Sequence, residues 1–192
     1  NGAVLPEQFA DKQAYAKTMF PDLTYGTNGP LRGGKQSTFE GGVRLPGIFH
    51  WPGVIPAGQV NATPMSVADI MPTALDFAAV PIPADRGYDG VSLRSELEQP
   101  GSEPELADRS LFFGSGSVTS MRSGDWKLVL PSQPNFIAGV SESPMLFNLK
   151  DDIGEAHDLA QAQPERLQAM LAELEDWETE ALADPVSRPA KP

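Results

Sequence analysis

A glycine-rich segment in the first quarter of the chain brings together residues that can hold an anion. Residues 32–44 contain two glycine pairs that bracket Lys35, two hydroxyl residues and Glu40. Glycine permits positive φ and lets backbone N–H groups approach a ligand closely. An ammonium on such a loop can neutralise a tetrahedral oxyanion as a compact point charge. The segment indicates either an oxyanion-binding loop charged by Lys35 or an ordinary hairpin with a surface lysine, and its spacing does not fit a phosphate-binding P-loop.

The elements around this segment are predicted from composition and periodicity. Residues 1–34 are rich in Gly, Pro, Asn and Thr and are predicted to be mostly loop. Residues 43–51 are largely apolar and favour a short buried strand, on which His50 would be a packed or edge histidine. Asp69 is a plausible N-cap for a helix that runs to Val80.

The second half of the chain is typical of a small antiparallel sheet covered by a helix. Four short β-prone runs are separated by Gly, Pro, Ser and Asp turns, which suits a sheet of about four strands. These runs are Ser110–Phe113, Ser117–Arg122, Trp126–Leu130 and Met145–Leu149. Residues 164–182 carry apolar side chains at helical spacing and predict a helix that packs across one face of the sheet. Residues 98–108 are acidic and predict a linker or surface loop.

Charge and composition exclude several partners. The formal net charge is −12, and it is concentrated after residue 60. Such a protein repels nucleic acid and anionic membranes, so we expect no nucleic-acid partner. No apolar run approaches the roughly 18 to 20 residues that span a bilayer, so no membrane span is expected. The sequence contains no cysteine, which excludes a disulfide, a thiolate metal site or a cysteine nucleophile within it.

A long motif then points to a family. Residues 34–46, followed by Trp51-Pro52-Gly53, closely resemble the GK-x-(S/T)-T-(F/Y/W)-EGG-x-R-x-P…WPG signature of type I sulfatases. Four later segments agree in order, because they resemble the DLLPT, DGVSL, RSGDWKL and LYNL…DPGE segments of the family. These are residues 69–73, 89–93, 122–128 and 146–155. The resemblance covers residues 26–182, and its details are similar to arylsulfatase and N-acetylgalactosamine-6-sulfatase-like members.

The resemblance implies the C-terminal portion of an alkaline-phosphatase-like α/β fold that hydrolyses sulfate esters. Residues 1–105 would form the end of the α/β catalytic domain as loop, strand and helix. Residues 106–183 would form an α+β subdomain with the antiparallel sheet and C-terminal helix, and residues 184–192 a disordered tail. Lys35 would be both catalytic and substrate-binding, because it would contact the sulfate and offset its charge as the S–O bond breaks. Arg44 is expected to anchor the loop to Glu40, which would be structural rather than a general base.

The same resemblance implies two groups that this sequence supplies in small part at most. The family nucleophile is a formylglycine made from Cys or Ser in a C/S-x-P-x-R motif, which does not occur here. Family members bind Ca²⁺ through upstream Asp residues and a late Asp-Asn-Gly motif, and Asn1 resembles the Asn of that motif. Asn1 is therefore the candidate metal ligand. Ca²⁺ takes 6–8 oxygen ligands, so we expect neither tight calcium binding nor turnover from these residues alone.

The expected partners follow from this assignment. They are a sulfate-ester small molecule or a sulfated sugar, and a missing N-terminal portion of the same protein. Without that portion, exposed strand edges and apolar faces would cause self-association, or residues 1–45 would be largely disordered. Family habit implies a periplasmic or secreted protein. Two alternatives stay open: a phosphate or phosphonate monoester hydrolase of the same superfamily, and a non-catalytic acidic interaction or carbohydrate-binding module.

Overall fold

Two compact units make up the fold of the computed structural model. Unit 1 combines residues 1–45 with residues 112–192, and unit 2 comprises residues 46–111. The structure describes five stretches of the chain, and all statements below refer to them. They are residues 28–35, 37–83, 87–115, 118–131 and 143–183. The predicted domain bounds, at residues 1–105, 106–183 and 184–192, remain a prediction.

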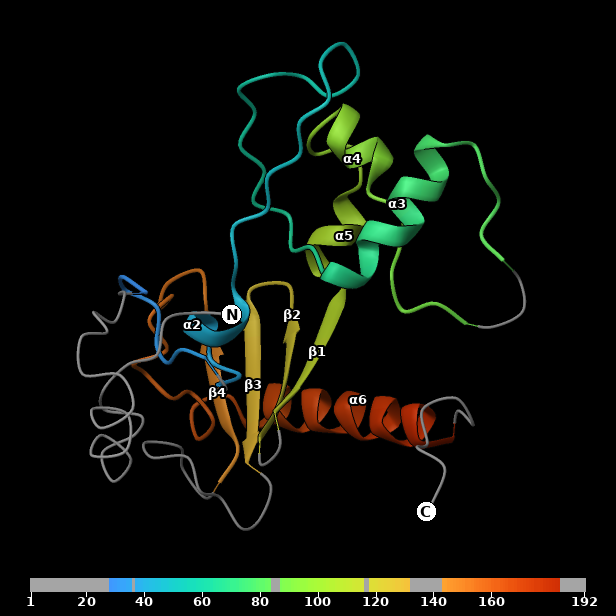
Figure 1. Ribbon diagram of the computed structural model, residues 1–192. Coiled ribbons are helices and arrows are strands. Elements are labelled where there is room, and N and C mark those ends of the chain that lie inside the picture. Colours follow the sequence, from blue (N-terminus) through green and yellow to red (C-terminus); the bar gives the residue numbers. More distant parts are fainter. Residues whose placement is uncertain (1–27, 36, 84–86, 116–117, 132–142, 184–192) are drawn as a thin grey trace, which may run out of the picture. The chain divides into compact units, whose positions relative to one another are not determined.

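A four-stranded sheet with the order β1-β2-β3-β4 forms the centre of unit 1 (Figure 1). Strands β2, β3 and β4 pair antiparallel, and Ser123 pairs with Trp126 across a tight turn. Gly124 in that turn has a φ of 57°, a conformation that glycine adopts without steric cost. The strands are β1 (Ser110–Ser115), β2 (Val118–Ser123), β3 (Trp126–Pro131) and β4 (Met145–Asn148). The predicted sheet is confirmed in strand number and approximate bounds.

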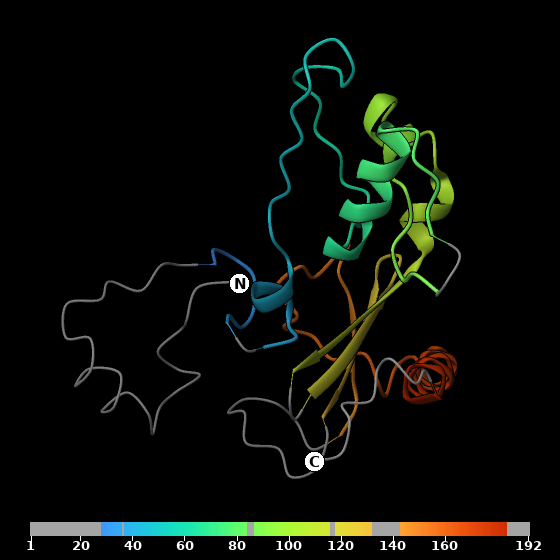
Figure 2. The ribbon, with the colours of Figure 1, turned by 45° about the vertical axis from the view of Figure 1, so that its right-hand side comes forward.

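The two faces of this sheet carry different elements. One face of the sheet meets α6 (Pro164–Ala183), and the other meets α2 (Glu40–Val43) with its loop (Figure 2). Because alternate side chains of a strand point to opposite faces, β2, β3 and β4 each contribute residues to both contacts. On the α6 face, Met121, Leu128 and Leu146 of β2, β3 and β4 pack with Met170 and Leu174 of the helix. On the α2 face, Phe39 packs with strand residues Val118, Val129, Met145 and Phe147. The α2 loop is thus seated directly on the sheet.

Helix α6 confirms the predicted C-terminal helix. Its apolar residues repeat at spacings of three and four, which places them on one side of the helix. Leu174 is fully buried there, and Trp177 stacks on Phe112 of β1 with ring centroids 4.6 Å apart. Apolar burial of this kind is what holds a 20-residue helix against a sheet in water. No helix among the described residues has both the length and the apolar character that a bilayer crossing requires.

Unit 2 is built from short helices. They are η2 (Val67–Asp69), α3 (Ile70–Phe77), α4 (Arg94–Glu98) and α5 (Pro104–Asp108). The predicted helix at residues 69–80 is present but begins differently. Ser66 is the N-cap of the 3₁₀ turn that precedes it, and Asp69 closes a capping box by accepting from the Ser66 N–H. Asp69 is the N-cap residue of α3, as predicted, but its side chain caps no N–H of that helix, because it accepts from the Ser66 N–H of the preceding turn instead.

Two further expectations are corrected. The predicted strand at residues 43–51 is absent, since α2 ends at Val43 and residues 44–50 have no regular structure. Pro46 cannot donate a hydrogen bond, and no described strand pairs with this stretch, so its apolar side chains are exposed, with Ile48 at 90%. His50 is exposed rather than packed. The predicted linker at residues 98–108 contains the end of α4 and all of α5.

Candidate functional site

The Lys35 loop (residues 32–41) is closed at its base by one backbone hydrogen bond. The Gly41 N–H donates to the Arg32 carbonyl oxygen at 2.7 Å, so the two stems of the loop meet. Inside the loop, the Ser37 N–H donates to the Gly34 carbonyl at 2.9 Å and makes a turn in which Lys35 is the second residue. Lys35 therefore lies at the tip of a loop whose ends are joined.

The glycines of this loop are required by close backbone approach. Gly33 has a φ of 75°, which disfavours any residue with a Cβ. A Cβ at Gly41 would overlap the carbonyl oxygens of Gly33 and Arg32, and one at Gly42 would overlap that of Ser37. The Gly41-Gly42 pair thus lets α2 pack onto the backbone of the loop that precedes it. The sequence pattern had indicated glycines for ligand approach, whereas the structure uses this pair for self-packing.

Lys35 differs from its neighbours in exposure. Gly34, Ser37 and Thr38 are buried, whereas Lys35 is exposed. Within the described ranges, no residue forms a hydrogen bond or ion pair with the Lys35 ammonium. A charge held on an ordered turn without a partner is available to a ligand, which is the arrangement that oxyanion stabilisation needs.

A buried ionic cluster lies beneath the loop and consists of Glu40, Lys127 and Glu155. All three side chains are at most 2% exposed. The Lys127 Nζ lies 2.7 Å from Glu40 Oε1 and 3.5 Å from Glu155 Oε1, so one ammonium serves two carboxylates. Arg44 and Arg122 approach the other Glu40 oxygen at 3.5 and 3.9 Å. The expected Arg44–Glu40 contact is confirmed, and Glu40 is structural, as predicted.

The two carboxylates of this cluster titrate differently. Burial acts to raise the pKa of Glu40, but the charge and hydrogen bond of Lys127, together with both arginines, hold that pKa below its usual value. Burial dominates at Glu155 and raises its pKa to about 7, against the opposing effect of Lys127. The nearest cation is committed to Glu40, and Glu155 Oε1 has no hydrogen-bond donor among the described residues. Glu155 is therefore the group of the cluster whose charge is least compensated.

Sequence reasoning missed Lys127 and Glu155 as members of the site. Lys127 lies 87 residues from Glu40 in the chain, and Glu155 lies 115 residues from it. One signal was available, because Lys127 follows Trp126 and precedes Leu128-Val129 in a β-prone run. A lysine inside such an apolar strand is a candidate for a buried, paired charge.

The structure leaves the predicted metal ligand open. Asn1 lies outside the described residues, and so does the glycine that follows it. Within the described ranges, no three His, Cys, Asp or Glu side chains gather as a cation would require. Calcium needs several charged oxygen ligands, and the described residues do not fit it.

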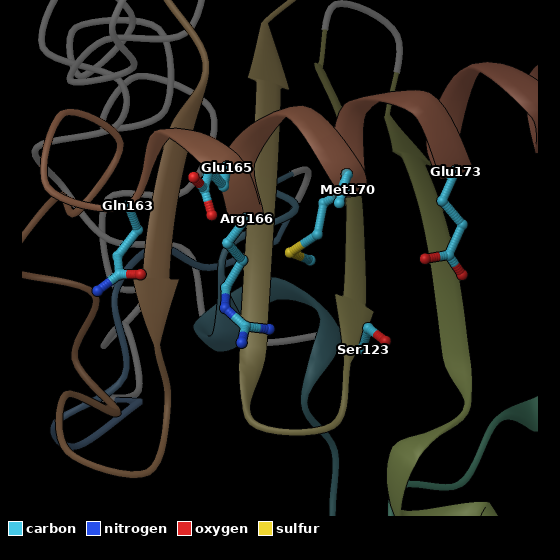
Figure 3. A pocket seen from close by; sticks show the side chains of 7 residues that line it. Ser123, Gln163, Glu165, Arg166, Met170 and Glu173 are labelled. Carbon is cyan, nitrogen blue, oxygen red and sulfur yellow. The ribbon is translucent and has the colours of Figure 1, made fainter.

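A surface hollow of about 430 Å³ lies along α6 (Figure 3). It is lined by Ser123, Gln163, Glu165, Arg166, Ala169, Met170 and Glu173. The Arg166 guanidinium lies 4.4 Å from the Trp126 ring centroid. An arginine that contacts an aromatic ring in this way is already engaged by the protein itself. The Lys35 loop is therefore the better candidate for an oxyanion site.

Comparisons with known proteins cover the segment that contains the Lys35 loop. Residues 9–80, which include the Lys35 loop, match the family model described as Sulfatase. The chain is 34% identical over 169 residues to N-acetylgalactosamine-6-sulfatase of Sus scrofa, covering 76% of this chain and 32% of that protein. It is 47% identical over 88 residues to arylsulfatase D of Homo sapiens, covering 45% of this chain and 14% of that protein. The chain thus spans about a third or less of the length of these curated relatives.

Solved structures give the same result for the fold. The structure of Ps i-CgsB matches with a TM-score of 0.65 and 27% identity, over 79% of this chain and 32% of that chain. A structure from work on glycosaminoglycan metabolism by Bacteroides thetaiotaomicron matches with a TM-score of 0.67 and 25% identity, at the same coverage. These neighbours and the four-stranded sheet with its helix bear out the predicted C-terminal portion of the sulfatase fold. Over the residues that these comparisons cover, the chain is similar to the sulfatase family.

Proposed function

We propose that this chain is the C-terminal part of a sulfate-ester hydrolase and that Lys35 binds the sulfuryl group of the substrate. The observation that carries the proposal is the exposed Lys35 ammonium at the tip of a closed loop, within the segment that matches the sulfatase family. This ammonium has no hydrogen-bond or ion-pair partner among the described residues. The reaction converts a sulfate ester and water into an alcohol and hydrogen sulfate. Lys35 would offset the negative charge on the sulfuryl oxygens as the S–O bond breaks.

The proposed substrate class is a sulfate ester of a small molecule or a sugar. The match over 169 residues to proteins named N-acetylgalactosamine-6-sulfatase supports a sugar ester first, and the shorter match to arylsulfatase D supports an aryl ester second. The formylglycine nucleophile and the calcium ion that the family resemblance implies would come from other parts of a longer protein. The chemistry assigned to the described residues is therefore charge neutralisation by Lys35 alone.

The test is turnover by the full-length protein of 4-nitrophenyl sulfate and of N-acetylgalactosamine 6-sulfate. Lys35→Ala is expected to lower kcat/KM about 100-fold or more, as loss of one oxyanion-stabilising group commonly does. Arg166→Ala, in the hollow along α6, serves as the matched control and should leave kcat/KM within about twofold. Equal turnover by the wild-type and Lys35→Ala proteins would remove Lys35 from the mechanism.

The alternative of a phosphate monoester hydrolase is tested in the same assay with 4-nitrophenyl phosphate. Both substrates offer a tetrahedral oxyanion that a lysine can neutralise. A kcat/KM for the phosphate ester that exceeds the value for both sulfate esters would replace the proposal with this alternative. Turnover of no ester by the full-length protein would favour a non-catalytic module.

A further inference from the structure

Glu155 contacts both stems of the Lys35 loop. Its carboxylate oxygen Oε2 accepts a hydrogen bond from the Glu40 N–H at 2.8 Å, next to the Gly41 that closes the loop. Its backbone carbonyl accepts from the Arg32 Nη1 at 2.8 Å, on the other stem. Both interactions are long-range, because Glu155 is 115 and 123 positions away from these residues. A single residue of the turn after β4 thus holds the two ends of the loop together.

Glu155 carries a side chain at a backbone conformation that disfavours one. Glu155 has a φ of 52°, in the left-handed region that glycine adopts far more readily than glutamate. Its predecessor Gly154 lies so close to the segment that leads into the loop that a Cβ there would be 3.0 Å from the Pro30 carbonyl oxygen. The turn therefore packs against the backbone just before the Lys35 loop, and its left-handed residue is the one whose side chain is fully buried. Strain at a site that the surrounding structure over-determines is a reason to look for a functional role.

The charged groups around Glu155 show which partner orients its carboxylate. Lys127 from β3 lies 3.5 Å away and is shared with Glu40 of α2, whose charge opposes ionisation of Glu155. Arg122 from β2 and Arg44 after α2 approach Glu40 rather than Glu155. The Glu40 N–H is then the donor that fixes the orientation of the Glu155 carboxylate. A buried acceptor with one strong donor is a geometric anchor, because losing either partner leaves a polar group unsatisfied.

We propose that Glu155 is a positioning residue for Lys35: it clamps the two stems of the loop and thereby sets where the ammonium meets the sulfuryl group. This inference rests on the proposed function for the role of Lys35, whereas the clamp itself does not. Misplacing a catalytic group by about 1 Å can cost on the order of 100-fold in rate. The clamp depends on the length of the side chain rather than on its charge, since an amide oxygen at the same place also accepts from an N–H.

The experiment compares four variants of the full-length protein with the wild type. Glu155→Gln keeps the reach and removes the charge, Glu155→Asp keeps the charge and shortens the reach, and Glu155→Ala removes both. Glu96→Ala is the matched control, because Glu96 is an equally buried carboxylate that holds unit 2 through four hydrogen bonds. Two readouts are used: kcat/KM for 4-nitrophenyl sulfate, and the rate at which trypsin cleaves after Lys35.

We expect Glu155→Ala and Glu155→Asp to lower kcat/KM about 10- to 100-fold and to speed cleavage after Lys35 at least 10-fold. Glu155→Gln should stay within about fivefold of the wild type in both readouts, and Glu96→Ala should leave cleavage after Lys35 unchanged. If Glu155→Ala yields no folded protein, the Asp and Gln variants decide between reach and charge. Wild-type behaviour of Glu155→Asp, or equal effects in Glu96→Ala, would overturn the clamp. Full turnover by Lys35→Ala would instead refute the role of Lys35, and the cleavage rates would still decide the clamp.

Discussion

Units 1 and 2 both bury carboxylates, but they compensate them differently. In unit 2, Asp69 binds Arg109 through both oxygens and also accepts from the N–H groups of Ser66 and Val91. Glu96 accepts from the side chains of Asn61 and Thr63 and from two backbone N–H groups. In unit 1, by contrast, two carboxylates share Lys127, and one oxygen of Glu155 has no donor among the described residues.

The pKa values follow this difference. Burial acts to raise the pKa of both Asp69 and Glu96. Arg109 and two backbone N–H groups nevertheless hold the pKa of Asp69 below normal, and the four hydrogen-bond donors around Glu96 do the same there. The pKa of Glu155 is raised instead, because the effect of burial exceeds that of Lys127, the one ammonium that it shares with Glu40. Fully satisfied carboxylates serve the stability of a fold, whereas an under-compensated one is typical of a position with a further task. The comparison thus separates the well-compensated carboxylates of unit 2 from the under-compensated Glu155 beneath the Lys35 loop.

The largest expected effect comes from removing the shared cation. Lys127→Met leaves Glu40 and Glu155 buried together without their ammonium, which should lower the free energy of unfolding by about 4 kcal/mol. Arg109→Met should cost less, about 2 to 3 kcal/mol, because Asp69 keeps two backbone donors. Chemical denaturation of both variants measures the two losses. A larger loss for Arg109→Met would reverse the comparison between the units.

A methyl group at Gly42 should be nearly as damaging. Its Cβ would overlap the Ser37 carbonyl oxygen, so the loop must move, at a cost of about 3 kcal/mol. Gly90→Ala in unit 2 meets the Ala68 carbonyl in the same way and should cost a similar amount. Calculated per folded molecule, kcat/KM should fall by about 10-fold or more in Gly42→Ala and should not fall in Gly90→Ala. Equal activity of these two variants per folded molecule would separate the loop from the reaction.

The pH dependence of stability distinguishes Glu155 from the other buried carboxylates. The folded-state pKa of about 7 lies above the ordinary value of 4.5, so the folded chain keeps a proton that the unfolded chain has released between these values. The stabilising contribution of Glu155 is therefore complete below pH 4.5 and is lost as the pH rises to 7, by about 2 to 3 kcal/mol. Glu40, Asp69 and Glu96, whose pKa values are lowered, stabilise at neutral pH and lose that contribution as the pH falls.

The measurement is the melting temperature of the wild-type and Glu155→Gln proteins between pH 5 and pH 8. The variant has no carboxyl to ionise at this position, so it should become more stable relative to the wild type as the pH rises. Glu96→Gln provides the control and should show no such change above pH 6. Parallel curves for the wild type and Glu155→Gln would contradict the raised pKa.

The smallest effect on stability is expected at Lys35 itself. Its side chain is exposed and has no partner among the described residues, so Lys35→Ala should change the free energy of unfolding by less than about 0.5 kcal/mol. Thermal unfolding checks this value, and activity loss with unchanged stability would mark Lys35 as functional. A loss of more than about 2 kcal/mol would show that the loop depends on Lys35 for its structure.

Local signals predicted a substantial part of this structure. The four β-prone runs and the period of α6 are short-range patterns, and Glu40 with Arg44 are four residues apart on one turn. Lys35 was found from its own segment because glycine pairs and a lysine can be read within about ten residues. The predicted strand at residues 43–51 failed because apolar content alone does not supply a neighbouring strand to pair with.

The sheet face that carries the loop could not be predicted from the same signals. Seating the loop depends on Phe39 among strand residues and on Lys127 between two distant carboxylates. Glu40 of the loop is 87 positions from Lys127 and 115 positions from Glu155, and no periodicity connects these residues. Glu155 in particular follows an ordinary Asp-Ile-Gly loop sequence, and only its left-handed backbone and its bond to the Glu40 N–H reveal its place.

Hydrogen exchange at the Gly41 amide tests the central claim most directly, because that N–H closes the base of the Lys35 loop. In the full-length protein, we expect this amide to exchange at least 10-fold faster in Glu155→Asp than in the wild type or Glu155→Gln. Glu96→Asp should leave its exchange rate unchanged. Equal protection of Gly41 in all four proteins would show that the loop is held without Glu155 and would contradict the clamp.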